Sequence, residues 1–361
     1  MPSTDENGTA AAAAAERHDS FPPAEPSVKT RKVQPESSED AKKNEAPTKL
    51  FCSACGKESN TLKKCDGCKC VWYCDKECQN KHWKEHKHEC KRIKKELDKR
   101  GGKLDLGTEI DIGPLGEVPP REECPICMHV LPIHQMLQAY AGCCGKTICG
   151  GCNIQHQWKS VGQTEDTRTC AFCRESIPQT DKECFTRLIA RVKVKDPKGL
   201  HSMAMHFFHG RLGLPLDPAK CIDLMRQAAD LGNAVSQYQL ATFYRTGEMG
   251  LEQNEEESLK YMEKAAEGGY LMARYNLGVA EHNKGNRAGA MHHLRLSVAG
   301  GAKWSMDSMI AYFEYGLLRH ADLSETLQSA YSARAELKTN GRDQYIAHLK
   351  ETGEYEAEYE M

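Results

Sequence analysis

The stretch CSACGKESNTLKKCDGCKCVWYCDKECQNKHWKEHKHEC, residues 52–90, decides how this chain begins to fold. It contains two Cys-x2-Cys pairs, followed by two pairs whose members are four residues apart. A Cys-x2-Cys turn directs two thiolates to one side, and we expect Gly56 and Gly67 to supply its unusual backbone angles. A spacing of four places two ligands on one helix face. Eight ligands suit two closed tetrahedral zinc sites. The eight are Cys52, Cys55, Cys65, Cys68, Cys74, Cys78, His86 and Cys90.

This stretch resembles the MYND zinc finger, which also shares Tyr73-Cys74, Cys78-Gln79 and Trp83. The resemblance implies that the pairs interleave. One zinc ion would be held by Cys52, Cys55, Cys74 and Cys78, and the other by Cys65, Cys68, His86 and Cys90. It also implies that short proline-rich peptides bind this finger.

Four further side chains of the finger carry expectations of their own. We expect Trp83 to pack in the core, with peptide binding at an exposed aromatic as the alternative. Cys70 is surplus to the eight ligands, and we expect a buried small side chain. His82 and His88 are expected to be solvated residues of the helix.

A second cysteine cluster follows, and it again supplies the ligands for two zinc ions. Its ligands are Cys124, Cys127, Cys143, Cys144, Cys149, Cys152, Cys170 and Cys173. The cluster resembles an all-cysteine variant of the RING finger. The resemblance implies that Cys124, Cys127, Cys149 and Cys152 share one zinc and that Cys144, Cys170 and Cys173 share the other. Cys143 is directly adjacent to Cys144, so the fourth ligand of that site stays open between Cys143 and His156.

The RING resemblance also implies a partner, a ubiquitin-conjugating enzyme. Ile126, Trp158 and Arg174 match the positions at which such fingers contact that enzyme, with Trp158 two residues late. A finger of this kind promotes ubiquitin transfer by orienting the reactants, without covalent chemistry of its own. Ala171 departs from the pattern, because a proline is usual there. Each of the three residues also has a purely structural interpretation, so ligase activity stays open.

The C-terminal half repeats with a period of 37 residues. Ala204, Ala241 and Gly278 are equivalent, as are Gly210 and Gly247. Each unit predicts two helices, which approach closely at the small residues and must stack on other units to bury their apolar faces. The pattern resembles the Sel-one-like repeat, a relative of the tetratricopeptide repeat, and implies that client proteins bind the array. The units are expected at about 200–235, 236–271 and 272–303, before a degenerate fourth.

Composition limits the class of protein. The chain has 361 residues, and its Lys+Arg count of 49 against an Asp+Glu count of 51 names no charged partner. Without a signal peptide we expect an intracellular protein of the cytoplasm or nucleus, where its cysteines bind metal instead of forming disulfides. No apolar run approaches the roughly 18 residues of a membrane span. Acidic residues interrupt the basic helix at 91–100, which disfavours nucleic-acid binding.

Together these patterns predict a mainly α protein. Two small cross-brace zinc-binding modules precede an α-solenoid of helix-pair repeats, and the N-terminal tail is disordered. The predicted function is a zinc-binding adaptor that recruits partner proteins, with a RING-type ubiquitin ligase as the alternative. The predicted segments are a disordered tail (1–48), a MYND-type finger (49–92), a helix extension and linker (93–120), a RING-like finger (121–180), helical repeats (185–345) and an acidic tail (346–361).

Overall fold

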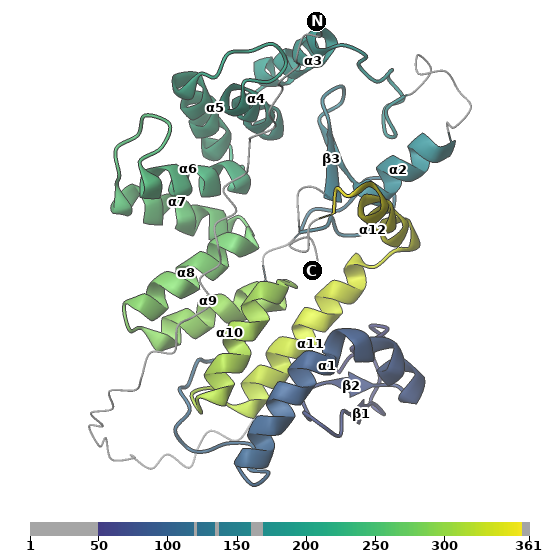
Figure 1. Cartoon of the computed structure of the whole chain (residues 1–361), viewed down its shortest axis with the longest axis vertical. Coiled ribbons are helices and arrows are strands. Elements are labelled where there is room, and N and C mark those ends of the chain that lie inside the picture. The colour runs from purple at the N-terminus through teal and green to yellow at the C-terminus, as the bar shows by residue number, and fades with distance from the viewer. Residues whose placement is uncertain (1–49, 119–120, 134–136, 160–168, 356–361) are drawn as a thin grey trace, which may run out of the picture. The chain divides into compact units, whose positions relative to one another are not determined.

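The computed structural model describes residues 50–118, 121–133, 137–159 and 169–355 (Figure 1). Helices dominate these ranges, and the strands form two small two-stranded sheets. The prediction of a mainly α fold is therefore confirmed. The predicted disordered tail, 1–48, and the end of the predicted acidic tail, 356–361, lie outside the described residues. Within the described ranges, no helix combines the length and apolarity needed to cross a membrane.

The first cysteine cluster is built from a short hairpin and one long helix. Strands β1 (Lys63–Lys64) and β2 (Trp72–Tyr73) pair antiparallel. Helix α1 (Lys76–Lys99) begins at Asp75, whose carboxylate accepts the backbone N–H of Cys78 at 2.8 Å. This cap satisfies a backbone donor that the first turn of a helix leaves unpaired. The helix ends before Gly101 and Gly102, whose left-handed φ angles of 63° and 81° stop it.

The second cysteine cluster forms a module of similar construction. Strands β3 (Gln138–Ala141) and β4 (Lys146–Cys149) make an antiparallel hairpin in which Gln138 pairs with Cys149. Helix α2 (Gly150–Lys159) follows β4 directly. Leu131 and Ile148 pack with the buried Cys124 and Cys149 in the interior of the module. A small apolar core therefore lies beside the cysteines, as a module of this size requires.

Helix α3 (Asp181–Lys193) leads into an array of helix pairs. The helices are α4 (Pro197–His209), α5 (Pro218–Asp230), α6 (Ala234–Thr246), α7 (Glu255–Glu267), α8 (Leu271–Asn283), α9 (Arg287–Ala299), α10 (Lys303–Glu314), α11 (His320–Leu337) and α12 (Asn340–Thr352). The first three pairs begin at the predicted spacing of 37 residues. Neighbouring helices pack in sequence order, as expected of a solenoid.

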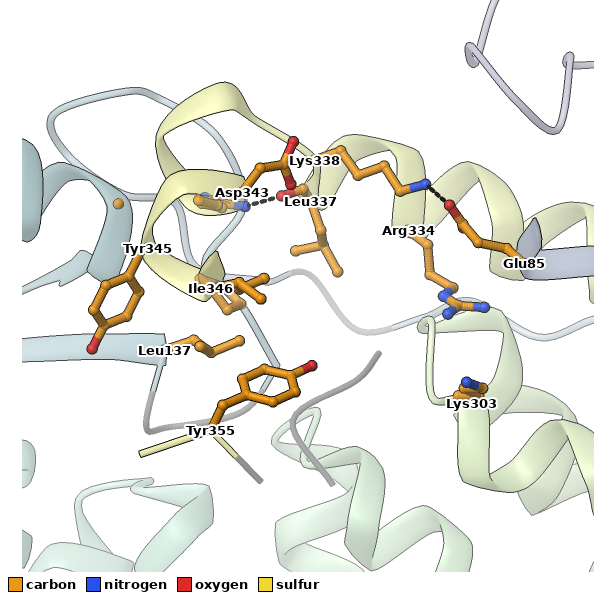
Figure 2. Close-up of a pocket in the computed structure, with 13 residues that line it drawn as sticks. Glu85, Leu137, Lys303, Arg334, Leu337, Lys338, Asp343, Tyr345, Ile346 and Tyr355 are labelled. Carbon is orange, nitrogen blue, oxygen red and sulfur yellow. Dashed lines mark hydrogen bonds and ion pairs between the residues drawn. The ribbon is translucent and has the colours of Figure 1, made fainter. Parts of the chain in front are cut away.

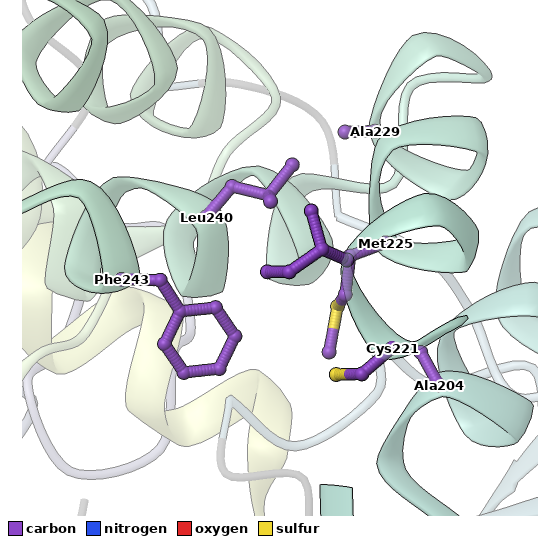
Figure 3. Close-up of a cluster of buried hydrophobic side chains, with 7 residues drawn as sticks. Ala204, Cys221, Met225, Ala229, Leu240 and Phe243 are labelled. Atoms are coloured by element: carbon purple, nitrogen blue, oxygen red, sulfur yellow. The ribbon is translucent and has the colours of Figure 1, made fainter. Parts of the chain in front are cut away.

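The small residues of the repeat lie where helices meet. Ala204 and Ala241 are fully buried, and Ala204 belongs to a cluster that includes Met225, Leu240 and Phe243 (Figure 3). At the third equivalent position, a Cβ atom on Gly278 would lie only 2.8 Å from Cγ of Leu294. Side-chain volume is therefore limited at this position of each repeat.

Loop length explains why the third unit is shorter. Gly210 and Gly247 adopt left-handed conformations at the ends of α4 and α6, and loops of similar length then lead to α5 and α7. Between α8 and α9 the connection consists of Lys284–Asn286 alone. The helices themselves keep their length, so the repeat shortens only in its loop.

The C-terminal helices differ from the predicted boundary of the acidic tail. Helix α12 runs to Thr352, and its Leu349 is buried. Residues 346–352 therefore belong to the folded part, because an apolar contact at Leu349 and a left-handed Gly353 fix the end of the helix.

Candidate metal centres

Four Cys-x2-Cys turns share one backbone geometry. In each turn the residue after the second cysteine donates its N–H to the carbonyl oxygen of the first cysteine, at 2.8–2.9 Å. That residue has a left-handed φ, and it is Gly56, Lys69, Met128 or Arg174. The turn thereby folds back on itself and directs both sulfurs to one side. The expectation for Gly56 is met, since its φ is 71°.

Gly67 is needed for a different reason than predicted. Its φ is not among the left-handed values, so the expectation of an unusual backbone angle is wrong. A Cβ atom on Gly67 would lie 2.8 Å from Sγ of Cys90. The glycine therefore leaves room for the metal ligands.

The first finger brings its eight predicted ligands into two sets. Ligand atoms of Cys52, Cys55, Cys74 and Cys78 lie within 4.8 Å of one another, and so do those of Cys65, Cys68, His86 and Cys90. These are the sets that the MYND resemblance implies. The second set is completely buried.

Distances within these sets fit tetrahedral zinc. Zinc–sulfur bonds of about 2.3 Å would separate two sulfurs by about 3.8 Å. Sγ of Cys55 lies 3.8 Å from Sγ of Cys74, and Sγ of Cys65 lies 3.7 Å from Sγ of Cys90. A disulfide would need about 2.05 Å, and the cysteines of the chain are free thiols. Bound zinc would supply structural cross-linking alone, because four protein ligands leave no open position.

The second module brings together two further sets. Cys124, Cys127, Cys149 and Cys152 form one set, and Cys143, Cys144, Cys170 and Cys173 form the other. The turn between β3 and β4, with Gly145 at a φ of 72°, lets adjacent Cys143 and Cys144 face the same point. Nε2 of His156 instead lies 3.0 Å from the carbonyl oxygen of Thr169. The geometry favours Cys143 over His156 as the fourth member of this set.

Backbone amides prepare the first cysteine of two turns for metal binding. Burial alone would raise the pKa of Cys52, but N–H groups of Cys55 and Ala54 point at its sulfur and lower that pKa to about 7. Cys124 has the same pKa of about 7, because backbone N–H groups, led by that of Cys127, outweigh the effect of burial. Hydrogen bonds to a thiolate favour the charged form that binds zinc.

Four expectations for side chains of the first finger can be compared with the structure. Cys70 is fully buried, as expected, and His88 is exposed. Trp83 is 37% exposed, so its expected place in the core is wrong. His82 is only 3% exposed and stacks on His86, so the expectation of a solvated residue is also wrong. The spacing already contained this signal, because His82, His86 and Cys90 follow at intervals of four along one helix face.

Three residues were predicted to contact a ubiquitin-conjugating enzyme, and the two whose side chains are described lie on the surface. Ile126 is 40% exposed and Arg174 is exposed. Met128 and Phe172, which the sequence reasoning did not single out, are 68% and 41% exposed. Trp158 lies in α2, and its side chain is outside the described part. Two of the Cys-x2-Cys turns therefore present apolar side chains to solvent.

Both modules contact helices of the array. Tyr140 donates its hydroxyl to the carboxylate of Asp196 at 2.9 Å, which joins the second module to the start of α4. In the first finger, Arg92 holds Glu314 of α10 through two hydrogen bonds of 3.0 and 2.7 Å. The two zinc modules and the array thus form one packed unit.

A cavity of about 260 Å³ lies among these elements (Figure 2). Leu137 of the second module and Arg334 of α11 line it, and Lys338 reaches from α11 to the carboxylate of Glu85 on α1. This ion pair adds a further link between the first finger and the C-terminal helices.

Comparisons with known proteins agree with these observations. The family model of the MYND finger matches residues 52–90, and that of the Sel1 repeat matches residues 197–233 and 234–270. The histone-lysine N-methyltransferase ASHR1 of Arabidopsis thaliana is 43% identical over 58 residues, which are 16% of this chain and 12% of the relative. The Tudor domain-containing protein 1 of Oryzias latipes is 46% identical over 46 residues, which are 13% of this chain and 4% of the relative.

A solved Sel1 repeat protein from Oxalobacter formigenes aligns with 35% of this chain and 97% of its own, at 23% identity and a TM-score of 0.32. The fold and its centres define a zinc-finger protein with a helical-repeat array. More particularly, the chain carries a MYND finger and two Sel1 repeats, the Sel-one-like repeats expected from the sequence. Its cysteine and histidine clusters are compatible with zinc binding.

Proposed function

We propose that this protein is an adaptor in which the MYND finger and the Sel1 array bind different proteins. The proposal rests on the way in which the cysteine and histidine ligands are grouped. Sixteen cysteine and histidine ligands form four closed sets, which suits structural zinc and leaves surfaces for recognition. Client proteins bind the array, and short proline-rich peptides bind the finger.

Trp83 is the residue that supports peptide binding at the MYND finger. It is 37% exposed on α1, and its ring meets that of His86 edge-on at 6.4 Å. An aromatic face held by a metal-anchored helix suits the extended, preformed conformation of a proline-rich segment.

Calorimetric titration of the zinc-loaded protein with a PxxP-containing peptide library tests this surface. Trp83→Ala should weaken the best peptide at least tenfold at unchanged zinc content. Tyr315→Ala, which removes a 60% exposed aromatic next to α10, is the control and should leave the affinity unchanged. Equal losses in the two variants, or no loss in either, contradict peptide binding at Trp83.

A second function, ubiquitin ligation by the RING-like module, is favoured by the exposed Ile126, Phe172 and Arg174. Self-ubiquitination with a broad panel of conjugating enzymes tests it, with Ile126→Ala as the disabling variant. Arg174 has a left-handed φ of 63°, so Arg174→Asn is a better second variant than alanine, because asparagine tolerates that conformation. Activity that both variants abolish at full zinc content supports a ligase, and inactivity of the wild type with every enzyme rejects it.

We further propose that the protein works in a reducing compartment, the cytoplasm or nucleus. Eighteen free cysteines, sixteen of them in the two zinc modules or beside them, support this location, since an oxidising environment would convert clustered thiols to disulfides. Imaging of the tagged full-length chain in cells tests it, and secretion of the tagged chain would contradict it.

A further inference from the structure

Helix α11 lies against the buried zinc centre of the MYND finger. This centre is the set Cys65, Cys68, His86 and Cys90. Nδ1 of His86 lies 3.2 Å from the hydroxyl of Tyr331, a residue of α11 that is 245 positions away in sequence. Tyr331 is 2% exposed, and its ring also meets that of His82 edge-on, with the centroids 4.3 Å apart. Figure 1 shows α11 alongside α1.

The geometry assigns separate roles to the two nitrogens of His86. Nε2 lies 3.3 Å from Sγ of Cys68, which places it among the sulfur ligands. Nδ1 then carries the proton and donates it to the hydroxyl oxygen of Tyr331. A metal-binding histidine commonly donates its other N–H to an acceptor that fixes the tautomer and the ring orientation. Here that acceptor comes from the far end of the chain.

The same face of α11 holds the backbone around this centre. Nε2 of His320 lies 2.8 Å from the carbonyl oxygen of Cys68 and donates to it. Ser324 donates its hydroxyl to the carbonyl oxygen of Cys70 at 2.8 Å, and Gln328 donates its amide to the carbonyl oxygen of Phe51.

These contacts form one continuous stripe. With Tyr331, the residues of α11 follow at intervals of four, four and three, which places all of them on one helix face. The stripe therefore meets the Cys65–Cys68 turn and the start of the finger together.

We propose that α11 is part of the second zinc centre of the MYND finger, with Tyr331 as the positioning residue for His86. The helix thereby couples zinc retention in the finger to the folding of the C-terminal helices. A finger confined to residues 52–90 lacks this support and holds one of its two zinc ions more weakly than the full chain does. This coupling is independent of which partners the adaptor binds.

Zinc release from the full-length, zinc-loaded protein to a chromogenic chelator tests the proposal. Tyr331→Phe keeps the ring and removes only the hydroxyl. One of the four zinc equivalents should then bind roughly 10–100 times more weakly, the usual effect of losing such an outer partner, and should transfer faster for that reason. The other three equivalents should keep their rates.

Tyr312→Phe is a matched control. Tyr312 is also a buried tyrosine, 4% exposed, and its hydroxyl lies 2.6 Å from Nδ1 of a histidine, His282, away from the metal ligands. This variant should release zinc as the wild type does. Unchanged release from Tyr331→Phe, or equal acceleration in Tyr312→Phe, overturns the proposal.

A second measurement does not depend on any variant. Long-range proton–nitrogen NMR of the zinc-loaded wild type should show His86 with its proton on Nδ1, slow to exchange with water. An Nδ1-metallated ring, or an Nδ1 proton in rapid exchange, overturns the proposal even if Tyr331→Phe fails to fold.

Discussion

The two glycines between Cys149 and Cys152 lead to a prediction about how the second cysteine module is attached to the array. Helix α2 packs against α12. A Cβ atom on Gly151 would lie 2.6 Å from the carbonyl carbon of Gly341 and 2.7 Å from the backbone nitrogen of Arg342. The φ of Gly151 is not left-handed, so the glycine is required for space and not for backbone conformation.

The variant Gly151→Ala should therefore weaken the docking of α12. Nonbonded atoms prefer separations of about 3.5–4.0 Å, so the two backbones must part by about 1 Å. Forced overpacking costs about 1–3 kcal/mol, whereas alanine gains only about 0.5–1 kcal/mol over glycine inside a helix. A net loss of 1–2 kcal/mol should lower amide protection of residues 340–352 about five- to thirtyfold in hydrogen-exchange mass spectrometry.

Gly341→Ala is the matched control across the same interface. The three atoms nearest to its Cβ atom would all belong to the side-chain amide of Gln155, the closest at 2.7 Å, and that group can rotate away. Protection of α12 should therefore stay the same or rise slightly. Zinc content should be unchanged in both variants. Full protection of α12 in Gly151→Ala refutes the steric argument, and loss of zinc would show that the glycine serves the metal turn instead.

Three further predictions concern the array. Gly278→Ala should cost about 1–2 kcal/mol of unfolding free energy in a urea titration, because its Cβ atom would lie 2.8 Å from Cγ of Leu294 and this overpacking outweighs the gain of alanine over glycine in a helix. A wild-type midpoint would contradict the close helix contact. Asn233→Ala should cost about 1 kcal/mol in the same titration, since Asn233 caps α6 by accepting the N–H of Ser236 at 2.8 Å; Asn233→Ser should restore most of it. Burial lowers the pKa of His201 to about 4, so the unfolded chain, with a histidine pKa of about 6.5, binds the proton more readily. The free energy of unfolding is therefore highest above pH 6.5 and decreases as the pH falls toward 4. The variant His201→Gln should show a smaller decrease than the wild type over this range. An unchanged decrease would assign the pH dependence to other groups.

Much of the fold was predictable because its signals are local. Cysteine spacing depends only on turn and helix geometry, so it indicated which residues come together within each module. The period of 37 likewise located the helix pairs, and the small residues Ala204, Ala241 and Gly278 marked their close contacts. The pairing of ligands into sets came from the MYND and RING resemblances, since spacing alone permits several pairings.

The contacts between modules were not predictable, because no local pattern encodes them. Tyr331 and His320 lie on α11, and a hydroxyl or an imidazole group on a helix can equally well face solvent. Only the tertiary arrangement brings these two side chains to the finger. The error at Trp83 has a related cause. An aromatic residue beside metal ligands is expected to pack in a core. However, the side chains of α11 cover the face of α1 that carries His82, and Trp83 lies at the edge of that contact.

The packing of the MYND finger on the array has a physical rationale on both sides of the interface. A finger of about 40 residues buries too little apolar surface to fold without further support, and the last pair of a solenoid has an apolar face that no following repeat covers. Helix α1 meets both needs at α10, where Arg100 stacks 4.2 Å over the ring of Phe313 and Arg92 holds Glu314. Because each surface covers the other, loss of zinc from the finger should also expose the end of the array, and the stability of the two parts is shared.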